Sequence, residues 1–426
     1  MLVSNISKLP HKFTVIFIAS YIMSDAKSFR AGLALAMAFF AGMLSSSLAT
    51  PLYSVYRKLY DFSASQIMII FGVYAAGVLV TLILTSRIKL QSSCYTLAIY
   101  FGLICVSVSS LLMFLADNII MLVAARFITG VGSGILMAYV NRSLLNIFNS
   151  EETNLAALNS SLALVIGQAL GPVVSGNALH YHFFALHSPF VFLLLASVVA
   201  IAAVRRYASV INQPDAIRGI WQKGRDKSDS FALLMINHVR TASAAIFLSW
   251  AMASTFMSQG PTISQNFYGL NNTQQVSYCL SAFLAIAGIT QLMMRRVRHL
   301  SSLNIGIAAQ VISMLLLLIS SLTVNSFLLT SAVLIEGFAY GAILVGAAAI
   351  VNRVAIHSGK AHLVNFLYII GYIGNWLPMI LSIVMDQTSL KVALTLYISL
   401  CLFIAVAVLI SGGLTHMVRS KSEKIL

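Results

Sequence analysis

Twelve long apolar stretches run through this 426-residue sequence, and each is long enough to cross a lipid bilayer as a helix. About 30 Å of hydrocarbon at a rise of 1.5 Å per residue requires roughly 20 apolar residues. The chain is 59% hydrophobic and only 9% charged, which leaves too little polar surface to cover a soluble domain. We predict spans at 31–52, 65–86, 94–115, 119–140, 155–177, 186–204, 239–259, 276–294, 303–322, 327–350, 362–384 and 390–411.

All twelve spans are expected to be helices, because an open sheet edge in lipid leaves N–H and C=O groups unpaired. A β-barrel would show short segments of alternating polarity, whereas these apolar runs are unbroken. The predicted fold class is therefore an all-α membrane protein with twelve transmembrane helices.

The formal net charge of +15 would fit nucleic-acid binding, but the placement of the basic residues argues against such a partner. With a cytoplasmic N-terminus, the outer loops hold only Arg57, Lys58 and Lys391, while nearly all other Lys and Arg fall in inner segments. This asymmetry follows the positive-inside rule. It predicts a multi-pass protein of the inner (plasma) membrane, surrounded by lipid, with both termini in the cytoplasm.

The chain divides into two similar halves. A charged connection at 205–238 separates them, and local features recur across it at a near-constant offset: Pro51 and Pro261, Pro172 and Pro378, and Val-Asn-Arg at 140–142 and 351–353. Six helices per half, starting on the same side, indicate parallel repeats. The predicted parts are a cytoplasmic N-terminal segment 1–30, a six-helix bundle 31–204, the cytoplasmic linker 205–238, a second bundle 239–411 and a cytoplasmic tail 412–426.

The N-terminal segment contains an apolar run at 13–23 that is too short to span a bilayer. Three interpretations stay open: a signal-like segment, an interfacial helix, or a translation start at Met23 rather than Met1.

Two local motifs resemble those of the major facilitator superfamily. Arg126-Phe-Ile-Thr-Gly130-Val-Gly132-Ser-Gly134 in the fourth span is similar to its R-x-x-x-G-x-G-x-G motif. Gly167-Gln-Ala-Leu-Gly171-Pro172-Val-Val-Ser-Gly176 in the fifth span is similar to the G-x-x-x-G-P-x-x-G motif typical of its proton-coupled exporters. The resemblance covers about residues 24–412 and implies the twelve-helix, two-bundle fold and alternating access.

One signature of that superfamily is altered here. The loop after the second span reads Leu84-Thr85-Ser86-Arg87-Ile88-Lys89-Leu90, with Ser86 where the family places an aspartate that helps to close the cytoplasmic side. The glycines expected in that loop are also replaced. The altered motif at 84–90 is the best support for a non-transporting role.

Small residues in the fourth and fifth spans are candidates for gating. Gly130 and Gly134, and Gly167 and Gly171, lie four residues apart on one helix face and allow two backbones to approach closely. Pro172 bends its helix, and Gly176 completes the motif. Either close packing alone or an interface on which the halves rock explains these residues.

Two side chains with a formal charge at neutral pH lie well inside predicted spans, Arg126 and Glu336. Such residues are costly in hydrocarbon and normally face a bundle interior or an aqueous cavity. An apolar setting near the midplane favours the protonated carboxyl of Glu336, which suits proton exchange. Arg126 either biases the protonation of Glu336 or holds an anionic solute, and a structural pairing of the two is the alternative.

Polar and aromatic side chains in several spans predict a solute cavity. The eleventh span carries a stripe at helical spacing, Asn365, Tyr368, Tyr372 and Asn375, next to Trp376. Further candidates are Gln168 in the fifth span, Tyr340 in the tenth, and Ser45, Ser46, Thr50, Ser254, Thr255 and Gln259 in the first and seventh spans. Polar contacts between helices explain many of them equally well.

The sequence carries none of the catalytic motifs that would predict an enzyme, a nucleotide site, a cofactor or a metal centre; the outer-loop histidines His180, His182 and His187 are not expected to bind metal. We predict a monomeric secondary active transporter that exports a small drug-like compound or metabolite in exchange for protons. The alternatives are a metabolite importer or facilitator, and a membrane sensor or assembly protein of the same fold.

Overall fold

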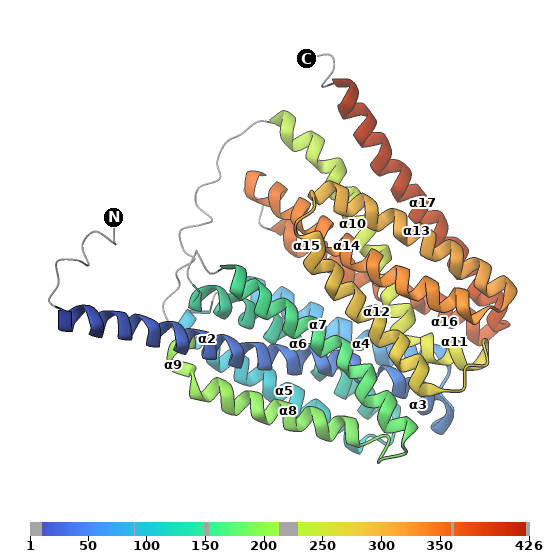
Figure 1. The fold of residues 1–426 in the computed structure, drawn as a ribbon. Helices are drawn as coiled ribbons and strands as arrows, with labels where there is room; N and C mark the ends of the chain where they lie inside the picture. Colours follow the sequence, from blue (N-terminus) through green and yellow to red (C-terminus); the bar gives the residue numbers. More distant parts are fainter. Residues whose placement is uncertain (1–10, 89, 149–152, 213–228, 359–361, 423–426) are drawn as a thin grey trace.

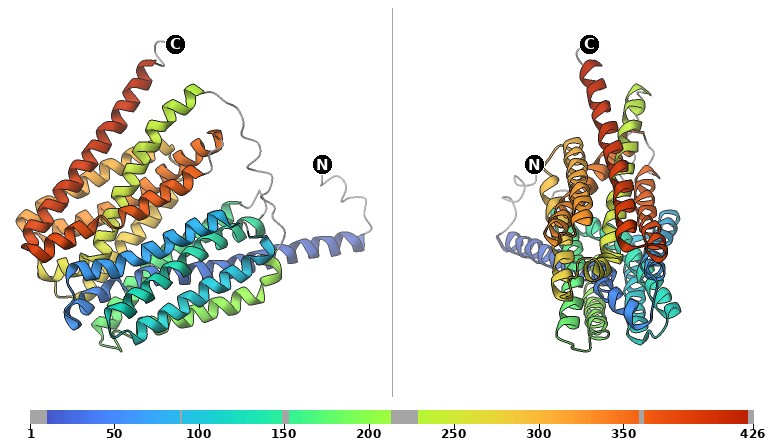
Figure 2. Two further views of the ribbon diagram at one scale, coloured as in Figure 1. Left: turned by 180° about the vertical axis from the view of Figure 1, so that it is seen from behind. Right: turned by 90° about the vertical axis from the view of Figure 1, so that its right-hand side faces the viewer.

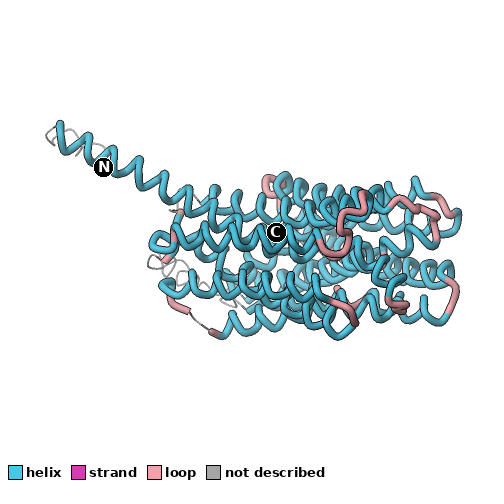
Figure 3. Tube along the Cα trace, turned by 90° about the horizontal axis from the view of Figure 1, so that it is seen from below, coloured by secondary structure: helices cyan, strands magenta, loops and turns pink. Residues whose placement is uncertain are grey.

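The computed structural model describes residues 11–88, 90–148, 153–212, 229–358 and 362–422. Within these ranges the chain is helical with short loops and no strand (Figure 3). The helices run along a common direction and most loops gather at their two ends. Eleven helical segments among the described residues are long and apolar enough to cross a membrane.

The N-terminal half supplies six long helices. They are α2 (His11–Ser47), α4 (Ala64–Arg87), α5 (Tyr95–Leu115), α6 (Ile119–Ile147), α7 (Thr153–His180) and α8 (Ser188–Arg206). Short helices η1 (Thr50–Leu52) and α3 (Tyr53–Leu59) follow α2, η2 (Ser92–Cys94) precedes α5, and α9 (Ala208–Ile211) follows α8. The predicted boundary at residue 30 falls inside α2, which continues without a break from His11.

The C-terminal half repeats this plan. Its elements are α10 (Asp229–Ser258), α11 (Gly260–Asn266), α12 (Thr273–Met294), α13 (His299–Thr323), α14 (Ser326–Ser358), α15 (His362–Gly374), α16 (Pro378–Gln387) and α17 (Leu390–Ser422). The predicted seventh span lies on α10, which is helical but is not among the eleven apolar segments. Most of the predicted linker 205–238 lies outside the described residues.

A break divides the predicted eleventh span into α15 and α16. Residues 375–377 form a turn, and Pro378 begins the second helix. Proline has no N–H to donate, and its ring clashes with the carbonyl four residues earlier, so a continuous helix is disfavoured at this point. The face presented by the span therefore changes after Asn375.

The two halves meet at one end of the molecule and diverge toward the other (Figures 1 and 2). We call the end where α2 begins and α17 ends the terminal end, and the opposite end the closed end. Two helix pairs make the main contacts between halves, α7 with α12 and α4 with α16. Gly176 of α7 packs on Ser277 of α12 near the closed end, and Gly288 of α12 packs on Val165 farther along.

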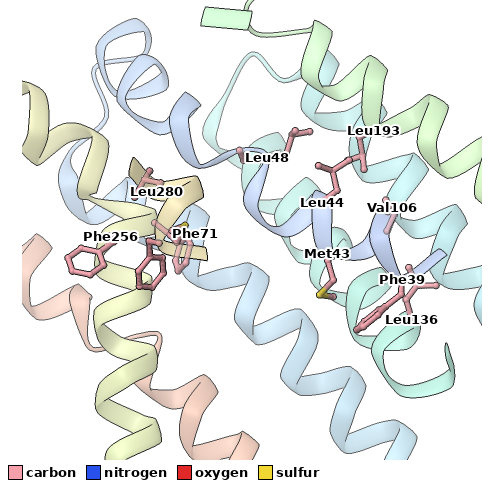
Figure 4. Close-up of a cluster of buried hydrophobic side chains, with 14 of the residues drawn as sticks. Phe39, Met43, Leu44, Leu48, Phe71, Val106, Leu136, Leu193, Phe256 and Leu280 are labelled. Atoms are coloured by element: carbon pink, nitrogen blue, oxygen red, sulfur yellow. The ribbon is translucent and has the colours of Figure 1, made fainter. Parts of the chain in front are cut away.

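Buried apolar side chains fill the interior of each half and continue across the boundary between the halves. Leu44, Leu48 and Phe39 of α2 are almost fully buried between α5, α6 and α8, beside Val106, Leu136 and Leu193 (Figure 4). Many large apolar side chains remain exposed on the outside, including Leu97, Phe101 and Phe403. A folded surface of this kind fits a lipid environment, where exposed apolar side chains carry no penalty.

Candidate functional site

A cavity of about 130 Å³ lies between the two halves. Its walls come from α2, η1, α4 and α7 on one side and from α10, α12, α14, α15 and the turn after α15 on the other. The lining side chains are polar or aromatic in large part: Ser46, Ser47, Thr50, Phe71, Tyr74, Gln168, Trp250, Ser254, Tyr340, Tyr372 and Asn375, with Ala253, Met257 and Leu284. None of these lining residues carries a formal charge.

Arg126 of α6 lies directly behind the wall of this cavity. Its side chain is 1% exposed. Nη1 donates to the Ser45 carbonyl and Nη2 to the Ser46 carbonyl, both at 3.2 Å. The guanidinium carbon lies 4.8 Å from the ring centre of Tyr74, a cation–π contact. Nε has no hydrogen-bond partner, so this buried cation is only partly satisfied.

Four of the six predicted substrate-binding residues line the cavity: Gln168, Tyr340, Tyr372 and Asn375. Ser46, Thr50 and Ser254, expected to contribute, line it as well. Ser45, Thr255 and Gln259 are buried elsewhere: Ser45 contacts Ser133, Thr255 contacts Tyr397, and Gln259 bridges the halves.

Tyr368 and Trp376 are placed differently from the predicted stripe. The ring of Tyr368 lies 6.4 Å from Trp250, behind the cavity wall. The ring of Trp376 packs against Gly72 of α4, because the turn at 375–377 redirects it toward the other half. The side chain of Asn365 lies outside the described residues.

Sequence reasoning missed several wall residues, and the most informative of them are Tyr74 and Trp250. Trp250 stands edge-on to Tyr372 with ring centres 4.7 Å apart. An aromatic residue inside a span is equally common where its ring merely packs against neighbouring helices. What marks Tyr74 as a residue of the site is its contact with Arg126 of α6, and this contact joins two different helices.

Glu336 lies inside the C-terminal bundle rather than at the cavity. It is fully buried, and its Oε1 accepts a hydrogen bond of 3.0 Å from Nε2 of Gln310 in α13. Ser313 and Cys401 lie beside it, while its Oε2 has no hydrogen-bond partner. No salt bridge joins it to Arg126 in the part of the chain described. Tyr340, one helical turn from Glu336, reaches the cavity.

The glycine motifs pack helices mostly within the N-terminal half. Gly130 and Gly134 of α6 lie against α4, at Tyr74, Val78 and Thr81. Gly167 and Gly171 of α7 lie against α2, where a Cβ at Gly171 would collide with the Ser47 side chain. Gly176 alone of the motif contacts the other half. Pro172 lies inside α7, which stays helical from Thr153 to His180.

Hydrogen bonds between the halves gather at the closed end. Asp386, the last acidic residue of α16, accepts from the main-chain nitrogens of Ala64 and Ser65 at 2.8 and 3.0 Å, so it caps the first turn of α4. Nε2 of Gln259 donates to the Ala64 carbonyl and to Ser382, both at 3.0 Å.

A second group of polar contacts closes the other side of this end. Asn177 of α7 accepts from Gln274 at 2.7 Å and from Tyr278 at 2.9 Å, both in α12. Within the described ranges no cluster of three metal-ligating side chains occurs, the region of His180, His182 and His187 included.

Comparison with known proteins places this architecture in context. A family model described as Major Facilitator Superfamily matches residues 35–375. No curated protein matches the chain.

Solved structures share the fold at low sequence identity. A bacterial homologue of the human lysosomal transporter Spinster, in an inward-facing and occupied conformation, is 13% identical with a TM-score of 0.65, covering 92% of this chain and 96% of that one. A POT family transporter in complex with 5-aminolevulinic acid is 12% identical with a TM-score of 0.67, over 92% and 96% of the two chains. A nucleoside transporter is 13% identical with a TM-score of 0.67, over 90% and 99%.

Proposed function

This chain belongs to the major facilitator superfamily, and from that premise we propose that it exports a small organic compound in exchange for protons. As a membrane transporter of this type it is a transport protein rather than an enzyme. Export, proton coupling and the nature of the solute are the parts that we propose.

The central cavity carries the proposal. It draws lining side chains from both halves, so a solute bound there contacts both bundles at once. Rocking of one bundle against the other around such a fixed site is the mechanism of alternating access. Hydroxyl and amide groups at Ser46, Gln168 and Asn375 hold polar groups of the solute, and Trp250 and Tyr372 offer aromatic surface.

We assign the coupling proton to Glu336. It is fully buried, and one carboxyl oxygen lacks a partner, so the neutral acid is the form that its surroundings favour. Glu336 lies one helical turn from Tyr340 in α14, and Tyr340 lines the cavity. A change of charge at Glu336 can therefore reach the cavity wall through this helix. Protonation and release at Glu336 then bias how α14 packs between α12 and α13.

The direction follows from topology and motif. Because most Lys and Arg lie toward the terminal end, we place that end in the cytoplasm of a plasma membrane, and this conformation is then closed to the outside. The Gly-Pro motif of α7 supports export in particular. Reporter fusions after Ser302 and after Phe267 test the orientation, with cytoplasmic and external signals expected respectively.

A flux assay in proteoliposomes tests the function itself. An imposed proton gradient is expected to drive solute out of the compartment that corresponds to the cytoplasm. Movement in the opposite direction would identify an importer or facilitator. Absence of solute movement under any gradient would favour the sensor or assembly role that the altered loop at 84–90 suggests.

A further inference from the structure

We infer that the solute of the central cavity is an organic anion, and that Arg126 sets this preference. The inference rests on the proposed transport function and deepens it by naming the charge class of the solute. It is carried by the placement of one buried, partly satisfied cation behind a cavity wall that contains no acidic residue.

Arg126 keeps its full positive charge in its surroundings. Two main-chain carbonyls and the face of Tyr74 hold the guanidinium, but no carboxylate is bonded to it in the described chain. Backbone carbonyls are dipoles and leave the net charge in place. A buried cation without a counter-ion extends its field into any nearby region of low dielectric constant.

Two carboxylates of the described spans, Asp386 and Glu336, already have other partners. Asp386 is engaged with the first turn of α4 at the closed end, and Glu336 is held by Gln310 inside the C-terminal bundle. Both are therefore committed to other partners. The cavity remains electropositive, and an anionic group bound in it completes the charge balance of Arg126.

Two residues of the cavity wall separate the Arg126 guanidinium from the solute. Ser46 and Tyr74 each line the cavity and each contact Arg126, Ser46 through its carbonyl and Tyr74 through its ring. We place the anionic group against this part of the wall. The aromatic surface of Trp250 and Tyr372, across the cavity, then receives the apolar part of the solute.

Organic cations are the rival class of solute for this cavity. Aromatic side chains also attract organic cations through the faces of their rings, and several rings line this cavity. The full charge on Arg126 opposes that attraction, and the ring nearest to it, Tyr74, already has its face on the guanidinium. The rings therefore serve as apolar surface here rather than as a cage for an amine.

Three probes of one shape and different charge test the inference: benzoate, benzamide and benzylamine at neutral pH. Binding to the purified full-length chain is followed by the fluorescence of Trp250, which lines the cavity, with Trp250→Phe as the control for the signal. Benzoate is expected to bind about ten-fold more tightly than either of the other probes. Equal or tighter binding of benzylamine, or no binding of benzoate, would overturn the inference.

Two variants connect the preference to the residue. Arg126→Gln is expected to abolish the discrimination between benzoate and benzamide, and Arg126→Lys to retain it. If Arg126→Gln does not fold, Arg126→Lys still decides, because loss of the preference in that folded, positively charged variant contradicts the inference. The assay needs no gradient, so a chain that binds benzoate but shows no proton-driven flux would refute the proposed coupling alone.

Discussion

The two halves of this transporter each bury one ionisable side chain inside a span, but they hold it in different ways. Arg126 of the N-terminal half contacts the wall of the central cavity and is bonded to carbonyls of α2. Glu336 of the C-terminal half is surrounded by α13, α14 and α17, and its hydrogen-bond partner is a neutral amide. On the function proposed above, this difference separates two tasks: Arg126 senses the charge of the solute, and the carboxyl of Glu336 carries a proton.

Loss of the N-terminal charge is expected to have the largest effect. Arg126→Ala removes the cation and leaves the carbonyls of Ser45 and Ser46 without their donor, so solute flux should fall at least about 100-fold, or about 2.7 kcal/mol. Arg142→Ala is the matched control, because Arg142 lies on the same helix and also stacks on a tyrosine, Tyr139, away from the cavity. Equal losses in the two variants would erase the distinction.

Loss of the Glu336 carboxyl should affect proton coupling but spare solute binding. Glu336→Gln keeps the shape and a hydrogen bond to Gln310 but cannot take up and release a proton by ionisation. Uphill accumulation is therefore expected to fall about ten-fold or more, while benzoate affinity stays within about two-fold. Undiminished gradient-driven flux in proteoliposomes would make Glu336 structural and move the coupling to another group.

Variants at two glycines of α7, Gly171 and Gly176, distinguish packing within one half from contact between the halves. Gly171→Leu forces α7 away from α2 and is expected to destabilise the N-terminal bundle by about 1–3 kcal/mol. Gly176→Leu presses on Ser277 of α12 instead, so transport should fall several-fold with little change in thermal stability. Gly260→Ala, where a Cβ meets no atom closer than 3.7 Å, is the control for both.

Asp386 is expected to give the smallest effect. Asp386→Asn weakens the cap on α4, and caps of this kind contribute about 0.5–2 kcal/mol, so the equilibrium should shift a few-fold toward opening at the closed end. Spin labels on α4 and α16 would report this opening as a longer distance between the two helices. Asp117→Asn is the control, since Asp117 bonds only its neighbour Asn118 in the same loop; a distance change there and none at Asp386 would contradict the assignment.

The sequence predicted the helices and the two-bundle plan well, because a bilayer imposes a length and an apolar composition on each span. Gln168, Tyr340, Tyr372 and Asn375, expected at a solute cavity from their place in the spans, do line the cavity, while their part in solute binding stays a prediction. The relation of Arg126 to Glu336 was open, because periodicity orders residues around one helix and carries no distance between helices of different halves.

Three features needed the structure. The turn at 375–377 moves Trp376 off the predicted face, and the kink caused by Pro378 does not fix its direction. Tyr74 is recognised only through Arg126. Asp386 lies at the end of a span, where an acidic residue is ordinary, and its role as a cap on α4 depends on a partner more than 300 residues away in the chain.

The contacts of Gln259 bear on the timing of the transport cycle. Asp386 contacts the partly exposed end of α4, where water can replace it at once, whereas Gln259 is fully buried and gives both of its bonds from one nitrogen. Separating the halves there leaves donor and acceptors briefly unsolvated, at about 1–3 kcal/mol for each unpaired group. We expect this single amide to make reopening the slow step, so that the dwell time of the closed state, rather than the affinity for solute, limits turnover.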